Sequence, residues 1–290
     1  MQYRVLGQSD LSVSSIGMGC VTFGRELDKN SSLPILDHAF EQGITLFDTA
    51  EAYAQGMSEQ VVGEWMQSRN VRDRIVLATK INGTLTRQRI ISSTEASLKR
   101  LQTDHIDLLQ THVWDDATPF QETLEALTMM VQQGKVRHIG CSNYSATQLA
   151  AALKLSETAG LSRMVSIQPP YNLVQRDIEA ELLPLCNAEN IGVISYSPLA
   201  AGFLTGKYRL GTSIPAGTRF DVIPGHQDIY FTDHGYQVLA QLDEESRATG
   251  KSHVELALTW LQEQPGITSV LIGARNTSQI DQALKSQSEN

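Results

Sequence analysis

The chain has few cysteines, and their scarcity bears on its compartment. Its 290 residues include only three, Cys20, Cys141 and Cys186, which are odd in number and widely spaced. A disulfide framework needs pairs of cysteines, so none is expected. The opening residues MQYRVLGQSD also lack the basic segment leading into an apolar one that marks a secretory signal. We therefore expect a reduced, cytoplasmic protein.

Long apolar runs and an excess of positive charge are also lacking. No apolar run approaches the roughly 18 to 20 residues that a membrane-spanning helix needs. Acidic residues outnumber basic ones by 32 to 23, and a net charge of -9 disfavours a broad interface with a phosphate backbone. We expect neither a membrane nor a nucleic-acid partner, but a small-molecule substrate. The oligomeric state stays open.

No proline-rich, serine-rich or charged linker divides the chain. With 41% hydrophobic and 19% charged residues, the composition is that of an ordinary globular protein. A length of 290 residues could hold two domains, but single α/β barrels often reach this size. We therefore expect one domain over residues 1–290.

Strand and helix patterns alternate along most of the chain. Before them, YRVL and LSVS flank GQSD, which predicts an N-terminal β-hairpin. Helical patterns such as LPILDHAFEQG and ETLEALTMMVQQG end in a residue suited to a helix C-cap. Strands are expected at 15–19, 44–48, 75–80, 106–112, 136–141, 164–168, 191–195 and 269–272. Eight such units predict an α/β fold, a (β/α)8 TIM barrel.

One connection is much longer than the others. The segment from Leu199 to Asp233, after the seventh strand, has about 35 residues and is rich in Gly, Pro, Thr and aromatic residues. An ordinary βα connection has only a few residues. We expect this long loop to be a functional lid.

Four polar residues fall at or just after predicted strand ends. They are Asp48, Tyr53, Lys80 and His112, which accompany the runs ITLF, RIVLAT and HIDLLQT. In a (β/α)8 barrel the strand ends and the loops after them form the active site, so these residues should meet in one pocket. For any one of them, capping, packing or solvent exposure is the commoner role. Their convergence favours catalysis.

These residue types together predict a proton donor. Tyrosine has a pKa of about 10 and is a slow acid at neutral pH unless its anion is stabilised. We expect Lys80 to lower the pKa of Tyr53 by roughly 1 to 3, and Asp48 to keep Lys80 charged. His112 can donate to a substrate carbonyl oxygen from the side opposite Tyr53.

The sequence around these residues resembles the aldo-keto reductase family, in the style of its longer bacterial members and of Shaker-channel β-subunits. The matching segments are GITLFDTAEAYAQGMSE, IVLATK, HIDLLQTH, GKVRHIGCSN, QPPYNLVQR, ISYSPLAAGFLTGKY and GARNTSQI. They are long, ordered and spread over nearly the whole chain, so the resemblance is specific. It implies hydride transfer between a nicotinamide cofactor and a carbonyl or alcohol, with the four residues as the catalytic set.

The resemblance also implies where the cofactor binds. Ser142, Asn143 and Gln168 match the family's carboxamide-binding residues, and Tyr196 matches the aromatic residue that stacks on the nicotinamide. The implied set continues with Ser197, Pro198, Leu199, Gly202, Lys207, Ile272, Gly273, Arg275 and Gln279. Lys207 and the backbone donors around it suit a pyrophosphate. Arg275 at the start of a short helix suits a further phosphate, which favours NADP(H) over NAD(H).

The last segment departs from the family pattern. Members usually continue it as Q-x-x-E-N, with the final two residues on the adenine, whereas this chain has Gln282 and Ala283 there. Relatives often have a further helix or tail beyond the position of Asn290 that walls the substrate pocket, so we expect an open pocket. Phe23 and Trp114 are expected to line it, although aromatic residues at a rim serve equally often as packing.

Other motifs fit less well. GMGCVTFG at 17–24 breaks the G-x-G-x-x-G spacing of a Rossmann motif, and GFLTGK is one residue short of a P-loop. His105 and His112 bracket one predicted strand and cannot share a metal ion, so no metal site is expected.

Three functions remain. The first is an NADP(H)-dependent reductase of an aldehyde, ketone or keto-sugar, working in either direction. The alternative is an NADPH-binding regulatory or interaction subunit with slow turnover. The third is Schiff-base chemistry at Lys80 as in barrel aldolases, which needs a neutral amine that Asp48 disfavours.

Overall fold

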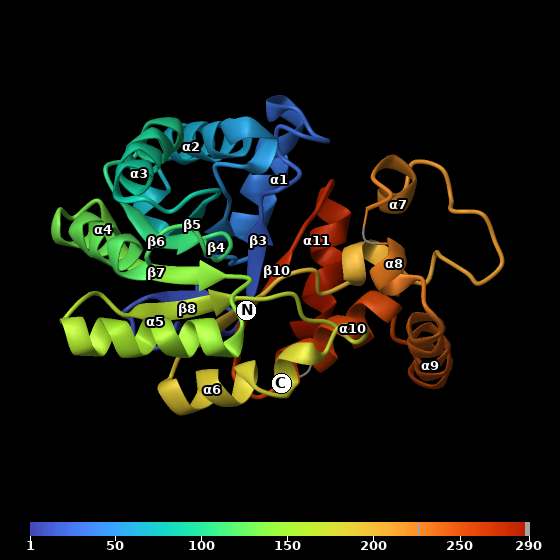
Figure 1. Ribbon diagram of the computed structural model, residues 1–290. Coiled ribbons are helices and arrows are strands. Elements are labelled where there is room, and N and C mark those ends of the chain that lie inside the picture. Colours follow the sequence, from blue (N-terminus) through green and yellow to red (C-terminus); the bar gives the residue numbers. More distant parts are fainter. Residues whose placement is uncertain (226, 288–290) are drawn as a thin grey trace.

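Eight parallel strands close into a barrel at the centre of the molecule (Figure 1). The computed structural model describes residues 1–225 and 227–287. In order around the barrel, the strands are β10 (Ile267–Ile272), β3 (Ile16–Gly19), β4 (Leu46–Asp48), β5 (Val76–Ile81), β6 (Ile106–Thr111), β7 (Val136–Ser142), β8 (Met164–Gln168) and β9 (Gly192–Ser195). Each overlaps one of the strands expected from the sequence. The predicted (β/α)8 barrel is confirmed.

Helices follow the strands and surround the barrel (Figure 1). Those after β3 to β8 are α1 (Lys29–Glu41), α2 (Met57–Arg69), α3 (Arg87–Leu101), α4 (Phe120–Gln132), α5 (Ala146–Ala159) and α6 (Leu182–Glu189). Towards the C-terminus lie α9 (Asp233–Thr249), α10 (His253–Glu263) and α11 (Thr277–Leu284). The side chains of Asp28, Thr86 and Ser145 each accept a hydrogen bond from a backbone N–H in the first turn, which explains where α1, α3 and α5 begin. Within the described residues, no helix is long and apolar enough to cross a membrane.

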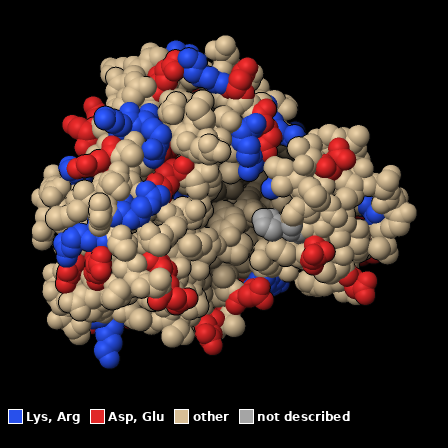
Figure 2. Space-filling model, turned by 45° about the horizontal axis from the view of Figure 1, so that its top comes forward, with Lys and Arg blue, Asp and Glu red and all other residues tan. Residues whose placement is uncertain are grey.

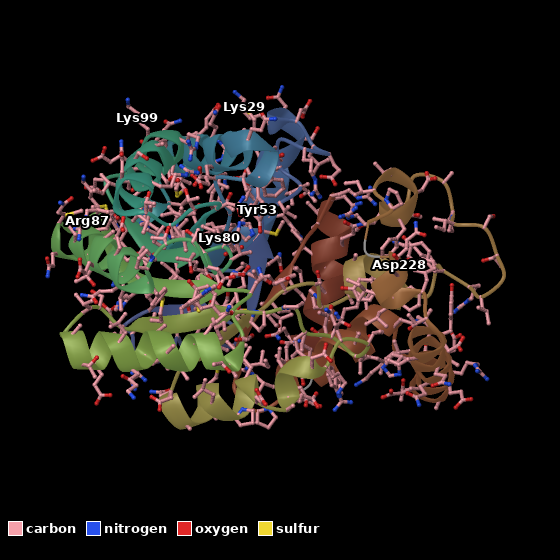
Figure 3. All side chains as sticks on the ribbon, in the orientation of Figure 1. Lys29, Tyr53, Lys80, Arg87, Lys99 and Asp228 are labelled. Atoms are coloured by element: carbon pink, nitrogen blue, oxygen red, sulfur yellow. The ribbon has the colours of Figure 1, made fainter. Side chains whose placement is uncertain are left out.

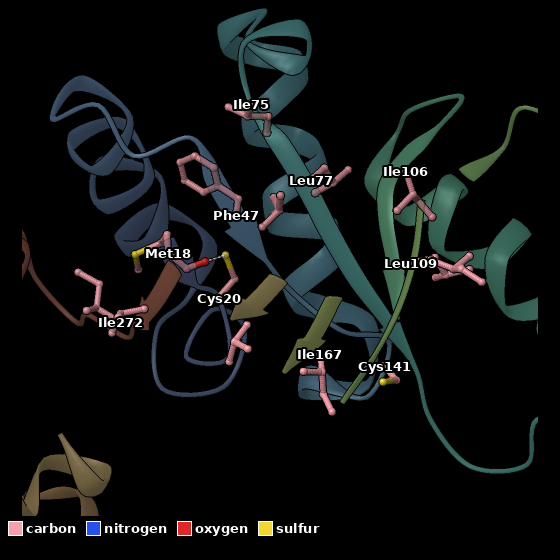
Figure 4. Close-up of a cluster of buried hydrophobic side chains, with 14 of the residues drawn as sticks. Met18, Cys20, Phe47, Ile75, Leu77, Ile106, Leu109, Cys141, Ile167 and Ile272 are labelled. Atoms are coloured by element: carbon pink, nitrogen blue, oxygen red, sulfur yellow. Dashed lines mark hydrogen bonds between the residues drawn. The ribbon is translucent and has the colours of Figure 1, made fainter. Parts of the chain in front are cut away.

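Apolar side chains fill the space between barrel and helices. Figure 4 shows part of this core, including Met18, Phe47 and Leu77, all without exposed surface. The three cysteines are also buried and unpaired. Burial raises the pKa of the Cys186 thiol to about 12, so this thiol stays protonated at neutral pH.

The predicted N-terminal hairpin is present and closes the end of the barrel at which the strands begin. Its strands are β1 (Tyr3–Val5) and β2 (Ser12–Ser14), with Arg4 opposite Val13. Leu6, Leu11 and Val13 pack against side chains inside the barrel at the N-terminal ends of its strands. Gly7 has φ +56°, and a Cβ there would lie 2.2 Å from the carbonyl oxygen of Val165, so only glycine fits. The C-terminal strand ends are left as the accessible end.

The long connection after β9 folds into a lobe beside the barrel. It contains η4 (Ala200–Thr205), α7 (Arg219–Val222) and α8 (Gln227–Tyr230). Its aromatic residues form their own hydrophobic cluster with residues of α9 and α10; the buried members from the connection are Ala200, Phe203, Leu204, Tyr208, Phe220 and Tyr230. The surface is hollowed between the barrel and this lobe (Figure 2). The connection is therefore as long as expected, but much of it is packed rather than an open loop.

Candidate active site

The four predicted catalytic residues lie at the C-terminal end of the barrel. Asp48 ends β4, Lys80 lies near the end of β5, His112 directly follows β6, and Tyr53 begins the short helix η1 (Tyr53–Gly56). Tyr53 and Lys80 lie together by the barrel, whereas Lys29, Arg87 and Lys99 lie at its outer edge (Figure 3). The structure thus brings together residues that are up to 64 positions apart, Asp48 and His112 being the extremes.

Lys80 forms a buried ion pair with Asp48. Its side chain has no exposed surface, and Nζ donates hydrogen bonds to Asp48 Oδ1 and to the Thr49 carbonyl oxygen at 3.0 Å. Nζ also lies 3.3 Å from the Tyr53 hydroxyl. Burial alone would lower the pKa of Lys80, but Asp48 and Tyr53 outweigh it and raise that pKa. Lys80 is therefore charged at neutral pH.

Two amides hold the other oxygen of Asp48. Gln110 Nε2 and Gln168 Nε2 donate to Asp48 Oδ2 at 3.1 and 2.9 Å. Gln110 is fully buried in β6 and was not predicted as a site residue. The sequence could have indicated Gln110 as a site residue, because it is two positions from Leu108 and alternate residues of a strand lie on the same face of the sheet. The amides leave Asp48 Oδ1 for Lys80.

Tyr53 has a different pKa from the one expected. Burial raises the pKa of Tyr53, and the opposing effect of Lys80, which lowers it, is smaller. The expectation that Lys80 brings this pKa below its usual value is therefore wrong for this structure. Tyr53 is protonated at neutral pH, which is the state that a proton donor requires.

The ring of His112 contacts the ring of Tyr53 edge to face. The ring centroids are 5.8 Å apart and the ring planes meet at 80°. Burial, and then the charge of Lys80, lower the pKa of His112 to about 4. His112 is thus neutral at pH 7 and has one N–H to donate. Its Nδ1 is buried without a hydrogen-bond partner among the described residues.

The predicted carboxamide-binding residues form one cluster beside His112. Asn143 Nδ2 donates to the His112 carbonyl oxygen at 2.9 Å, and the Tyr196 hydroxyl donates to Asn143 Oδ1 at 2.8 Å. Ser142 Oγ donates to the Gln168 carbonyl oxygen at 2.7 Å. These strand ends therefore hold amides, a hydroxyl and an aromatic ring together, which fits the amide and ring of a nicotinamide.

The turn after β9 has a backbone that suits close approach of a ligand. Ser197 has φ 55° and Gly202 has φ 89°, both left-handed. The buried Asn172 donates from Nδ2 to the Ser197 carbonyl oxygen at 3.0 Å and so holds this turn. The other predicted residues of the turn, Pro198 and Leu199, lie between them.

Two cations face the same region. Lys207 follows η4 and Arg275 follows β10, after Ile272 and Gly273. Burial, and then the charge of Arg275, lower the pKa of Lys207, and Lys207 Nζ would lie 3.2 Å from a Cβ at Gly202. Within the described part of the chain, neither forms an ion pair with a carboxylate. Two cations that pair with no carboxylate are suited to an anionic group such as a phosphate.

Two further features belong to this candidate phosphate site, namely the start of α11 and one more arginine. Gln279 Oε1 accepts from the Arg275 backbone N–H at 2.7 Å, and Asn276 caps the helix. Burial, and then the charge of Arg25 in the loop after β3, lower the pKa of Arg219 in α7. Arg219 was not predicted, since nothing local in the sequence indicates that the lobe meets the loop after β3.

Comparison with known proteins identifies the family. Residues 15–289 match the aldo/keto reductase family. The chain belongs to this family. It is 35% identical to a probable voltage-gated potassium channel subunit beta of Arabidopsis thaliana, over 98% of this chain and 90% of the relative. It is also 35% identical to the aldo-keto reductase YhdN of Bacillus subtilis, over 97% of this chain and 87% of the relative. Protein tas of Escherichia coli is 32% identical, over 99% and 93%.

Family membership makes this chain an oxidoreductase of the aldo/keto reductase family. The structure also bears on the two aromatic residues that were expected to line the substrate pocket. Phe23 has no exposed surface and belongs to the barrel core, which argues against its assignment to the substrate pocket. Trp114 is half-buried, and its ring stacks on Phe120 with centroids 4.7 Å apart.

The structure also accounts for part of the departure of α11 from the Q-x-x-E-N pattern. Ala283 is buried against the core and cannot contact an adenine, whereas Gln282 is exposed. Asp281, the residue before Gln282, pairs with His38 of α1 at 2.6 Å. This stretch of α11 thus secures the helix to the barrel.

Proposed function

We propose that the protein is an NADP(H)-dependent carbonyl reductase that converts an aldehyde, a ketone or a keto-sugar to the alcohol, or catalyses the reverse reaction. The observation that carries the proposal is the contact of 3.3 Å between the Tyr53 hydroxyl and Lys80 Nζ, beside a neutral His112. A protonated tyrosine next to a fixed cation is a donor whose anion is stabilised as it forms.

Each residue has a role that follows from its contacts. A substrate carbonyl oxygen between Tyr53 and His112 accepts a hydrogen bond from His112, which polarises the carbonyl group. A reduced nicotinamide, when bound, would supply the hydride to the carbonyl carbon. Tyr53 gives its proton to the substrate oxygen, and Lys80 stabilises the phenolate that remains. Asp48, held by Gln110 and Gln168, keeps Lys80 charged and in place.

Residues on both sides of the hollow support a preference for NADP(H). Ser142, Asn143 and Gln168 would hold the carboxamide, and Tyr196 would stack on the ring. Lys207 and Arg275 would bind phosphates, which favours NADP(H) over NAD(H) because NADP(H) carries one phosphate more. We also propose that the chain works as a single domain and in the cytoplasm, where its three unpaired cysteines stay reduced.

Two other functions are less well supported. The name of the Arabidopsis relative keeps a regulatory channel-subunit role in view, but an intact donor arrangement favours turnover. Schiff-base chemistry needs a neutral lysine, and the raised pKa of Lys80 opposes it.

Titration of the tryptophan fluorescence with NADPH and with NADH, followed by absorbance at the nicotinamide band on adding aldehydes, ketones and keto-sugars, tests the proposal. Tight NADPH binding with oxidation by one class of carbonyl is the expected result. Tight binding without turnover would favour the regulatory role, and absence of binding would refute the cofactor site.

A further inference from the structure

The turn that carries Tyr53 has an unfavourable backbone. Directly after Tyr53, Ala54 and Gln55 have φ 48° and 55°, and Gly56 has φ 86°. Residues with a side chain rarely adopt left-handed conformations, and such a conformation persists only where surrounding contacts hold it. The Tyr53 hydroxyl has Lys80 as its only hydrogen-bond partner among the described residues. Its position therefore depends on what holds the turn.

A buried carboxylate lies directly behind this turn. Glu59, in the first turn of α2, has no exposed surface. Its Oε1 accepts from Thr79 Oγ1 at 2.6 Å, and its Oε2 accepts from Arg100 Nε at 2.6 Å. Thr79 is the residue before Lys80 in β5. One side chain thus connects the element that follows Tyr53 to the strand that carries Lys80.

Arg100 supports the turn from α3. A Cβ at Gly56 would lie 2.7 Å from Arg100 Cδ, so the arginine side chain lies against the turn itself. Arg100 also donates to Ser97 Oγ at 3.1 Å. A buried carboxylate that loses its charge leaves its partner uncompensated, so this pair is sensitive to substitution.

A second set of hydrogen bonds ties the same turn to β3 and β4. Ser58 Oγ donates to the Cys20 carbonyl oxygen at 2.7 Å and lies 2.8 Å from Thr49 Oγ1. The Thr49 carbonyl oxygen in turn accepts from Lys80. The start of α2 is therefore fixed to the elements that hold the Asp48–Lys80 pair.

We propose that Glu59, with Arg100 and Thr79, is a positioning residue that sets the distance between the Tyr53 hydroxyl and Lys80. It touches neither substrate nor cofactor and acts through the backbone on both sides of that contact. The inference rests on the proposed function for its effect on turnover, but not for its effect on the ionisation of Tyr53.

The test is Glu59→Gln, with Glu64→Gln as the matched control. Glu64 lies on the same helix and pairs with Lys29 at the surface, at 2.9 Å. In Glu59→Gln we expect kcat to fall by about 10- to 100-fold while NADPH affinity is retained, since small misplacements of reacting groups are costly. Because Lys80 lowers the pKa of Tyr53, a longer contact should move the ionisation of Tyr53 to higher pH. Glu64→Gln should match the wild type in all three measurements.

Ultraviolet difference titration measures the ionisation of Tyr53 and does not depend on turnover. The signal of Tyr53 is the one that is absent from Tyr53→Phe. An unchanged Tyr53 titration in folded Glu59→Gln would overturn the inference, even if activity fell. A wild type without cofactor binding or turnover would refute the proposed function instead, and the titration would still decide the role of Glu59.

Thr79→Val and Thr79→Ser cover the case in which Glu59→Gln does not fold. Thr79→Val leaves the Glu59–Arg100 pair in place and removes only the hydroxyl that Glu59 accepts from. We expect it to shift the titration in the same direction, and Thr79→Ser to restore the wild-type value. A wild-type titration in Thr79→Val would contradict the proposal.

Discussion

The barrel end and the lobe after β9 face the same hollow but are stabilised in different ways. At the barrel end, Asp48 and Lys80 form a buried pair that is held by hydrogen bonds from neighbouring strands. In the lobe, Phe203 contacts Tyr208, Tyr230, Phe231 and Tyr236 through aromatic packing. Charge-assisted hydrogen bonds are directional and fix the positions of individual atoms, whereas aromatic packing buries a large apolar area with less directional constraint. The division suits proton transfer at the barrel and recognition of a ligand by the lobe.

The sharpest test of the barrel end is Tyr53→Phe. The ring stays, so cofactor binding and folding should be nearly unchanged, but the proton is lost. Turnover should fall by roughly 10² to 10⁴, as is typical of a lost general acid. Steady-state kinetics and fluorescence titration measure the two effects separately, and retained turnover would exclude Tyr53 as the donor.

Breaking the buried ion pair should cost stability as well as activity. Asp48→Asn leaves the Lys80 charge buried without its partner, and we expect a loss of about 3–5 kcal/mol in the free energy of unfolding. The control is Arg87→Gln, which breaks a surface pair with Glu125 at 2.7 Å. Its cost should be about 0–1 kcal/mol. Denaturant titration measures the loss in the free energy of unfolding for both variants. Equal losses would show that the buried pair stabilises the fold no more than the surface pair does.

Truncation in the lobe should separate the two regions. Phe203→Ala removes the central ring of the aromatic cluster and should destabilise the lobe by about 3–5 kcal/mol. We expect weaker NADPH binding but an unchanged Tyr53 titration, because the contacts that join Tyr53 to Lys80 and His112 are made without residues of the described part of the lobe. A shifted titration would show that the lobe and the barrel end are coupled.

Removing one cation should affect one cofactor more than the other. Arg275→Ala is expected to weaken NADPH by about 10-fold or more, the usual worth of a charge-assisted hydrogen bond, with a smaller effect on NADH. Parallel fluorescence titrations with both cofactors give the ratio. If both lost affinity equally, Arg275 would not bind the extra phosphate.

The last prediction concerns the pH dependence of stability. The pKa of His112 in the folded protein is about 4, below the ordinary value of 6.5, so the unfolded chain binds more protons between these values. The contribution of His112 to stability is therefore present above pH 6.5 and is lost as the pH falls towards 4. Denaturant titrations at several pH values should show a smaller loss in His112→Asn than in the wild type. An identical pH dependence would contradict this.

Much of the fold followed from local pattern. Short apolar runs between amphipathic segments predicted all eight barrel strands, and YRVL and LSVS predicted the hairpin. Asp48, Tyr53, Lys80 and His112 could be predicted to meet because parallel strands of a barrel all end on one side. Phe23 shows where this reasoning stops. It lies just after a correctly predicted strand, but only its neighbours from other elements decide whether its side chain serves the site or the core.

The sequence by itself determined the order of the elements, the end of the barrel where the polar residues gather and the family to which the chain belongs. These depend on periodicity and on residue types at strand ends, which are local properties. Only the tertiary structure decided the direction of the pKa shift of Tyr53, the packing of the lobe and the hydrogen bonds of Glu59 with Thr79 and Arg100. Burial, charge and contact at these places come from residues far apart in the chain, and no local pattern records them.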